Sequence, residues 1–160
     1  MTEECPPSGE VVVEDAPERV ERRSVIVDAS PEQIFDLLAD PSRHAEIDGS
    51  GTVRGSRTSS PQRLGPGAKF GMDMKFGVPY RMTNTVVDFE ENELIAWRHM
   101  GRHVWRYRLE PLDDGRTKVT EEFDWRPAIF PPALKAINAP RDNAASIEKT
   151  LANLAERFAN

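Results

Sequence analysis

The protein has 160 residues, a length that predicts one globular domain with its own hydrophobic core. Its net charge of −6 gives no general attraction to nucleic acid or to an anionic membrane surface. The single cysteine, Cys5, excludes an internal disulfide, and no apolar run approaches the roughly 18 residues of a membrane-spanning helix.

Residues 1–19 are rich in glutamate, proline and serine, and we expect a flexible tail there, ahead of a single domain over residues 20–160. This start lacks the basic and apolar segments of a secretory signal, which favours a cytoplasmic location. The first predicted strand lies around Val25 and Val27, where apolar and polar residues alternate.

A helix is predicted to begin after Ser30, which has the character of an N-cap, with Pro31 at the first helical position and Gln33 completing a capping box. It is expected to end at Asp40, because the residue before a proline avoids helical geometry. Residues 42–47 predict a second short helix.

Six strands are predicted at 52–59, 68–76, 79–89, 94–100, 103–110 and 116–126, separated by turn signals. A short helix or turn is expected over 130–140. From about 140 to 158, apolar residues recur at spacings of three and four, which predicts a helix long enough to cross a sheet. This order indicates an α+β fold with helices on one face of a curved antiparallel sheet.

The large side chains gather on the sheet face beneath the helices. In "KFGMDMKF", every second residue is large and apolar: Phe70, two methionines and Phe76. The flexible methionine side chains suit a surface that adapts to varied shapes. A three-residue loop at 100–102 joins strands 94–100 and 103–110 into a hairpin and sets their register. In this register Trp97 lies opposite Trp105 and His99 opposite His103. Strand 79–89 carries Asn84 and Val86 on this face in one register, but Val87 and Phe89 then require a bulge or a different register.

Four segments together resemble the START-related, Bet v 1-like superfamily (SRPBCC), and within it the polyketide cyclase/dehydrase-like group. They are "SVIVDASPEQIFDLLADPSRHAEID", "GMDMKFGVPYRMTNTVVDFEENELIAWRH", "HVWRYRLEPLDDGRTKVTEEFDW" and "SIEKTLANLAERFA". The resemblance covers about residues 22–159 and implies a helix-grip fold, with the sheet wrapped around the C-terminal helix and two short helices after the first strand. It also implies a ligand cavity between sheet and helix. The superfamily shares no catalytic motif, so it assigns no catalytic residue here.

The function favoured by the sequence is binding of a small hydrophobic or aromatic molecule, lipid or polyketide-like, in an internal cavity. One alternative is an enzyme of the cyclase or dehydratase kind, in which Glu121, with His99, transfers protons, because burial raises the pKa of a carboxyl group. The other reading of Glu121 is that a twist of the strand brings it to solvent or to an arginine. A second alternative is a regulatory or chaperone-like interaction protein. The expected ligand-binding residues are Phe70, Met72, Met74, Phe76, Tyr80, Met82, Asn84, Trp97, His99, Trp105, Tyr107, Phe123 and Leu151.

Neither a metal nor a cofactor is expected. His99 and His103 form a pair, but a metal site needs at least a third ligand, and Glu121 is the acidic candidate on this face. Arg98, Arg106 and Arg108 form a basic stripe on the opposite face, and without exposed aromatic residues it does not indicate nucleic-acid binding. The sequence leaves monomer and dimer both open.

Overall fold

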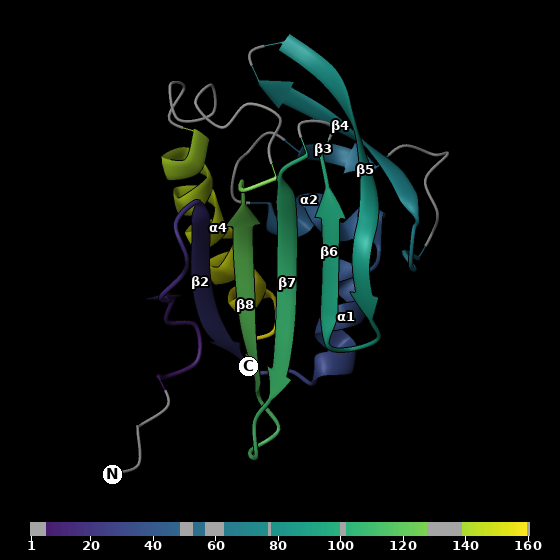
Figure 1. The fold of residues 1–160 in the computed structure, drawn as a ribbon. Helices are drawn as coiled ribbons and strands as arrows, with labels where there is room; N and C mark the ends of the chain where they lie inside the picture. The colour runs from purple at the N-terminus through teal and green to yellow at the C-terminus, as the bar shows by residue number, and fades with distance from the viewer. Residues whose placement is uncertain are drawn as a thin grey trace.

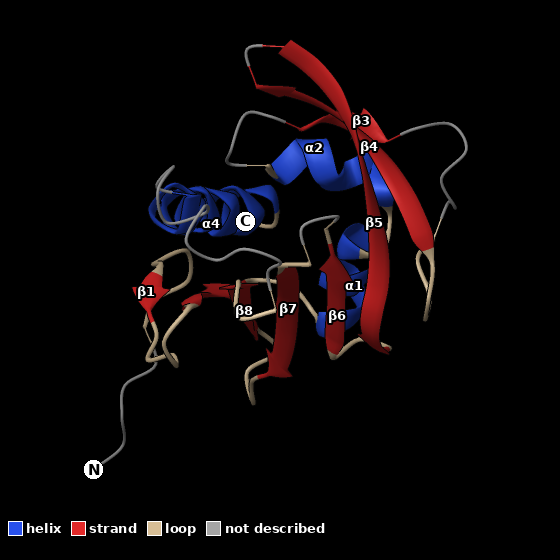
Figure 2. Ribbon diagram, turned by 45° about the horizontal axis from the view of Figure 1, so that its top comes forward, coloured by secondary structure: helices blue, strands red, loops and turns tan. Residues whose placement is uncertain are grey.

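One antiparallel β-sheet, curved across its width, forms the body of the molecule, and the helices cover one of its faces (Figures 1 and 2). The computed structural model describes residues 6–48, 53–56, 63–76, 78–99, 102–127 and 139–159; the side chains at 53–56, 72–76, 78–82 and 139–140 lie outside that description. The predicted short helix or turn near 130 falls on residues that are not described. The fold is the predicted α+β arrangement, with two short helical segments after the first long strand.

Eight strands of the described chain lie in the order β1-β2-β8-β7-β6-β5-β4-β3, each antiparallel to its neighbour. Six strands were predicted between residues 51 and 126. Each predicted strand end that falls on a described residue lies within two residues of the observed end. The strands are β1 (Val12–Val13), β2 (Val20–Val27), β3 (Val53–Ser56), β4 (Lys69–Phe76), β5 (Val78–Glu90), β6 (Leu94–Arg98), β7 (Val104–Pro111) and β8 (Thr117–Asp124).

Helix α1 (Pro31–Leu38) begins where the sequence predicts it. The Ser30 side chain accepts a hydrogen bond from the backbone N–H of Gln33, and the Gln33 side chain accepts one from the backbone N–H of Ser30, so two free donors at the helix start are satisfied. A 3₁₀ turn, η1 (Pro41–Arg43), and the short α2 (His44–Ile47) follow at once. The apolar side of α1 is fully buried and fixes these segments against the sheet.

Helix α4 (Ala139–Arg157) packs across β2 and β8. Its residues Ala144, Ile147, Leu151 and Leu154 are buried, which confirms the predicted apolar side of the helix. The side-chain amide of Asn153 donates a hydrogen bond to the backbone carbonyl of Ile47 at 3.2 Å. The C-terminal helix is therefore attached both to the sheet and to the short helical segment that closes one end of the core.

Strand β5 contains a bulge, one of the two arrangements that its sequence allows. Val86 pairs with Trp97 and Asp88 with Ala96, so Val87 is an extra residue with no partner on β6. Val87 is 41% exposed, whereas Val86 is buried and Phe89 packs on the core. One inserted residue thus lets both Val86 and Phe89 face inward.

The segment predicted as a flexible tail contains β1, which pairs with β2 through Val12 and Val13. The backbone N–H of Gly9 donates to the carbonyl of Ile26, and that of Glu14 donates to the carbonyl of Arg22. Valine favours extended structure, and Val11 packs against the core, which accounts for a strand inside this polar segment. The domain boundary at residue 20 stays a prediction.

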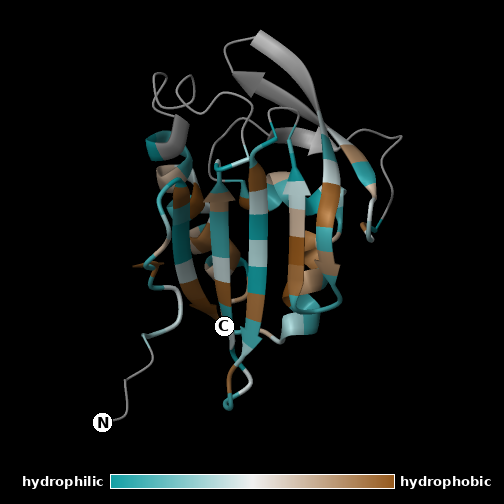
Figure 3. Ribbon diagram, in the orientation of Figure 1, coloured by the Kyte–Doolittle hydropathy of each residue, from teal (hydrophilic) through white to brown (hydrophobic). Residues whose placement is uncertain are grey.

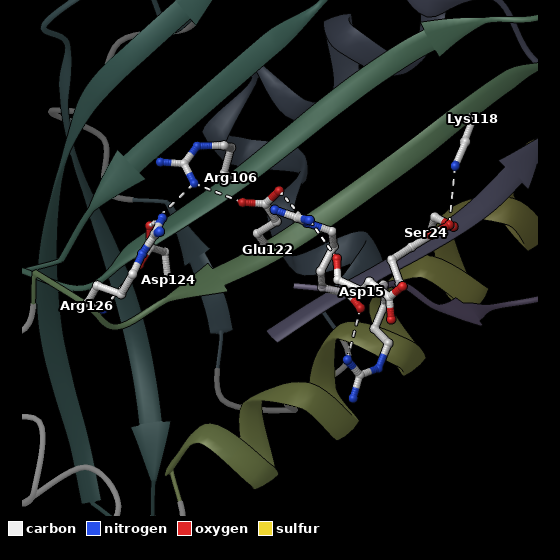
Figure 4. A network of polar contacts seen from close by, with 10 residues as sticks. Asp15, Ser24, Arg106, Lys118, Glu122, Asp124 and Arg126 are labelled. Carbon is white, nitrogen blue, oxygen red and sulfur yellow. Dashed lines mark hydrogen bonds and ion pairs between the residues drawn. The ribbon is translucent and has the colours of Figure 1, made fainter. Parts of the chain in front are cut away.

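Hydrophilic and hydrophobic residues alternate along the strands (Figure 3). On the outer sheet face, ion pairs engage Arg106, one arginine of the predicted basic stripe (Figure 4). Glu122 accepts hydrogen bonds from Arg22 and from Arg106, both at 2.9 Å. Asp124 binds Arg126 at 2.8 Å and lies 3.6 Å from Arg106. We call these five residues the outer ion-pair network. Glu122 and Asp124 neutralise Arg106, so this arginine no longer adds free positive charge to the predicted stripe.

Candidate functional site

An aromatic wall lines the inner face of the sheet, on the strands that face the helices. Trp97 and Trp105 are cross-strand partners, as the predicted hairpin register requires. The ring of Trp97 lies 5.6 Å from that of Tyr107 and 5.5 Å from that of Phe70, measured between centroids. Trp105 and Phe123 are 4.8 Å apart. The aromatic wall consists of Phe70, Trp97, Trp105, Tyr107 and Phe123.

Two histidines stand at one end of this wall, where β6 and β7 join. The backbone N–H of His99 donates to the carbonyl of His103 at 3.0 Å, and the two rings stack 4.7 Å apart. Burial lowers the pKa of His99 to about 3, helped by the neighbouring His103, and lowers the pKa of His103 to about 4. Both imidazoles are therefore uncharged at neutral pH.

Glu121 lies on β8 opposite Tyr107 of β7, and its side chain is buried. Burial raises the pKa of Glu121 to about 8; the hydrogen bond from Tyr107 opposes this rise and the charge of Asp48 adds to it. Burial, with the Glu121 charge and hydrogen bond, raises the pKa of Tyr107 well above its usual value. At neutral pH the carboxyl group of Glu121 is therefore largely protonated, and it is hydrogen-bonded to the phenol of Tyr107. The pair can both donate and accept a hydrogen bond.

Several buried polar atoms near the wall have no hydrogen-bond partner within the described part of the chain. A buried polar atom without a hydrogen bond lowers the stability of the folded state by about 1–3 kcal/mol, so such atoms are uncommon. A bound ligand that forms the missing hydrogen bond removes this penalty. We call them the unpaired polar set: Asn84 Oδ1, His99 Nδ1, His103 Nδ1, Trp105 Nε1, Glu121 Oε2 and Trp125 Nε1. Two are indole donors, and the amide oxygen of Asn84 is an acceptor, so the set offers both kinds of group.

The structure brings together the described members of the predicted site. Phe70, Asn84, Trp97, Tyr107, Phe123 and Leu151 are buried, while His99 and Trp105 are half-buried beside them. The backbone register pairs Met72 with Met82 and Met74 with Tyr80. The side chains of those four residues and of Phe76 lie outside the described part. That all these residues contact a ligand stays a prediction.

Sequence reasoning missed the role of His44 in this region. Its Nε2–H donates to the carbonyl of Leu38 at 2.7 Å, and its ring stacks on Trp97 with centroids 5.0 Å apart. Burial lowers the pKa of His44, so this imidazole is uncharged as well. His44 reaches Trp97 because α2 packs against the sheet, and no local sequence pattern predicts that contact.

Among the described residues, no group of three or more histidine, cysteine, aspartate or glutamate side chains is placed to hold a metal ion. None of the helices in the described ranges is long and apolar enough to span a membrane.

The architecture described above is the helix-grip fold, and comparisons with known proteins place it in a family. The model of the family described as polyketide cyclase / dehydrase and lipid transport matches residues 19–159. The chain therefore belongs to this family, within the START-related, Bet v 1-like superfamily that its sequence resembles. A relative from Mycobacterium tuberculosis, "Uncharacterized protein Rv0088", is 44% identical over 153 residues, which cover 92% of this chain and 67% of the relative.

Solved structures share the fold at lower identity. The Polyketide_cyc-like protein Cgl2372 from Corynebacterium glutamicum is 21% identical, with a TM-score of 0.60 over 86% of this chain and 90% of that protein. An AHSA1-like protein from Aeromonas hydrophila is 16% identical, with a TM-score of 0.59 over 85% and 93% of the two chains. At these identities the likeness shows the fold alone.

Proposed function

We propose that the protein binds a small hydrophobic or aromatic molecule, lipid or polyketide-like, between the inner face of the sheet and α4. The observation that supports this most directly is the unpaired polar set beside the aromatic wall. Apolar rings supply most of the contact area in ligand sites, and a few placed polar groups fix orientation. A ligand with an apolar ring body and one or more hydroxyl or carbonyl groups matches both features.

Fluorescence titration of the purified protein tests this proposal. Oleic acid, cholesterol and a tetracyclic aromatic polyketide serve as probes, and mass spectrometry of a solvent extract checks for a ligand acquired in the cell. At least one probe is expected to change tryptophan emission in a saturable way, because Trp97 and Trp105 belong to the wall. Absence of a saturable change with every probe, together with an empty extract, contradicts binding.

The Glu121 and His99 side chains are expected to orient the ligand. Glu121→Gln and His99→Asn retain size and some hydrogen bonding, so each should weaken probe binding by about 0.5–3 kcal/mol, the worth of one or two hydrogen bonds. Glu110→Gln is the matched control, because Glu110 is an exposed glutamate on β7. Equal affinities for the wild type and both inner-face variants would remove these residues from the site.

A second candidate function is proton transfer to or from the bound molecule, as in a cyclase or dehydratase. One feature favours it: Glu121 is buried and hydrogen-bonded to Tyr107, and burial raises its pKa to about 8, which suits proton transfer near neutral pH. In that case Glu121→Gln should lower product formation by roughly 100- to 10,000-fold while probe affinity is nearly unchanged. Product analysis of the polyketide probe after incubation distinguishes the enzyme from the binder, for which no product is expected from any variant.

A further inference from the structure

A second polar site lies on the outer side of the sheet beside the β6–β7 turn, where His99, at the end of the aromatic wall, is one of its lining residues. It is a hollow of about 270 Å³, which we call the basic hollow. This volume is below the roughly 300–1,000 Å³ of typical pockets for drug-sized ligands, so it suits a compact ligand. Its described lining residues are Lys69, Thr83, Thr85, Arg98, His99 and Arg102.

The strand register explains why these side chains meet. Lys69 of β4 pairs with Thr85 of β5, and Thr85 pairs in turn with Arg98 of β6, so three adjacent strands present one row of polar residues. Arg102 joins them from the β6–β7 turn. Its backbone has a positive φ of 67°, and its N–H donates to the His99 carbonyl at 2.9 Å, which fixes the turn beside the row.

The electrostatics of the basic hollow differ from those of the neighbouring outer ion-pair network. In the network each arginine meets a carboxylate, and Arg106 alone contacts both Glu122 and Asp124 (Figure 4). Lys69, Arg98 and Arg102 are exposed, and among the described residues none of their side chains forms an ion pair or hydrogen bond. Three unneutralised cations around one hollow, in a chain of net charge −6, create a local positive field.

Such a lining matches the chemistry of a tetrahedral oxyanion. Arginine and lysine form charge-assisted hydrogen bonds to phosphate oxygens, and threonine hydroxyls add neutral donors. The uncharged imidazole of His99 adds a further polar edge. We propose that the basic hollow binds a phosphate-like anion, held by Lys69, Arg98 and Arg102. The phosphate belongs either to a small soluble molecule or to a phospholipid headgroup, and both present the same group to the hollow.

Two binding measurements at physiological ionic strength distinguish these sources. The first titrates inorganic phosphate and follows the backbone amides of β5 and β6 by NMR. The second measures co-sedimentation with vesicles of phosphatidylcholine alone and of an equal mixture of phosphatidylcholine and phosphatidic acid. Phosphate binding without vesicle binding indicates a soluble source; binding to the mixed vesicles indicates a headgroup.

Arg98→Gln is expected to weaken binding by roughly 10- to 100-fold, the factor for loss of one charge-assisted hydrogen bond. Lys69→Gln should act in the same direction. Arg108→Gln is the matched control, because Arg108 is an exposed arginine of β7, outside the hollow, and no ion pair holds it within the described chain. Binding in either assay that Arg98→Gln loses and Arg108→Gln keeps supports the proposal. No binding in both assays, or equal losses in the two variants, overturns it.

Discussion

Glu121 and Glu122 are successive residues of one strand, yet the sheet gives them opposite surroundings. Glu122 lies on the outer face and accepts hydrogen bonds from two arginines. Glu121 lies on the inner face, where Tyr107 is its hydrogen-bond partner and burial raises its pKa to about 8. The same side chain is thus an ion-pair acceptor at one position and a weak acid at the next.

The raised pKa of Glu121 makes the free energy of unfolding depend on pH. The folded state holds the proton up to about pH 8, whereas the unfolded chain releases it near 4.5, so stability falls as pH rises between these values. His99 and His103 act in the opposite sense below pH 6.5, because their folded pKa values are lowered. We expect greatest stability near pH 6.5 and a loss of roughly 1–2 kcal/mol by pH 8.

Urea unfolding across this range measures that loss. In Glu121→Gln the group no longer titrates, so the decline from pH 6.5 to 8 should disappear, and the histidines leave stability level or slightly rising. Glu110→Gln should keep the decline of the wild type, because Glu110 is exposed. A decline of equal size in Glu121→Gln would show that another group causes it.

At the scale of single residues, alternation in the sequence was enough to predict the inward-facing tryptophans and Glu121. It did not predict that Glu121 bonds to Tyr107, because that pairing depends on the register of β7 against β8. It also missed the stacking of His44 on Trp97, which depends on how a short helix packs. Local periodicity determines which side of an element a residue faces, whereas its partner depends on the positions of two elements.

Helix α4 stabilises the sheet by burying one apolar side against β2 and β8. Leu151 is fully buried there, so Leu151→Ala should lower the free energy of unfolding by about 2–5 kcal/mol, through lost contacts and a residual cavity. Lys149→Ala, at an exposed position of the same helix, should change it by less than about 0.5 kcal/mol. Chemical denaturation measures both, and an unchanged midpoint for Leu151→Ala would contradict this packing.

Elements were more predictable from the sequence than their connections. The capping box at Ser30 and the spacing of apolar residues in α4 are local signals, and both helices begin close to where the sequence indicates. The sequence indicated an irregularity near Val87, a bulge or a changed register, because Val86 and Phe89 cannot share a face in a regular strand; the structure has the bulge. Strand β1 was missed, because two valines in a polar segment carry little signal until β2 offers its free edge.

On the scale of the whole molecule, the sheet separates two kinds of chemistry. Aromatic rings and uncharged polar groups lie on the face that the helices cover, while the outer face carries ion pairs together with cations that form no ion pair within the described chain. Both edges of the described sheet are short strands, β1 and β3, which limits pairing with other chains.

Removal of residues 1–15 tests the protective role of β1. This deletion exposes the edge of β2, an eight-residue strand whose Arg22 and Ile26 carbonyls otherwise accept hydrogen bonds from Glu14 and Gly9. We expect concentration-dependent self-association, detectable by analytical ultracentrifugation. Ser8→Ala, which removes a side-chain hydrogen bond to Asp28 but keeps the strand, should leave the association state of the full chain unchanged. If the truncated chain has the same association state as the full chain, β1 does not protect the edge of β2 from self-association.

The pairing of β2 with β8 also has a kinetic consequence. Arg22 and Glu122 meet although they are 100 residues apart along the chain, and every bond between these two strands closes a comparably long loop. Contacts of this range slow folding, because the entropy of loop closure is lost before the contact forms. During synthesis β2 emerges well before its partner β8, and β4 to β7, which lie between them in the sequence, can already form local hairpins. Strand β8 and α4 complete the core together, so the inner face forms only after both have emerged.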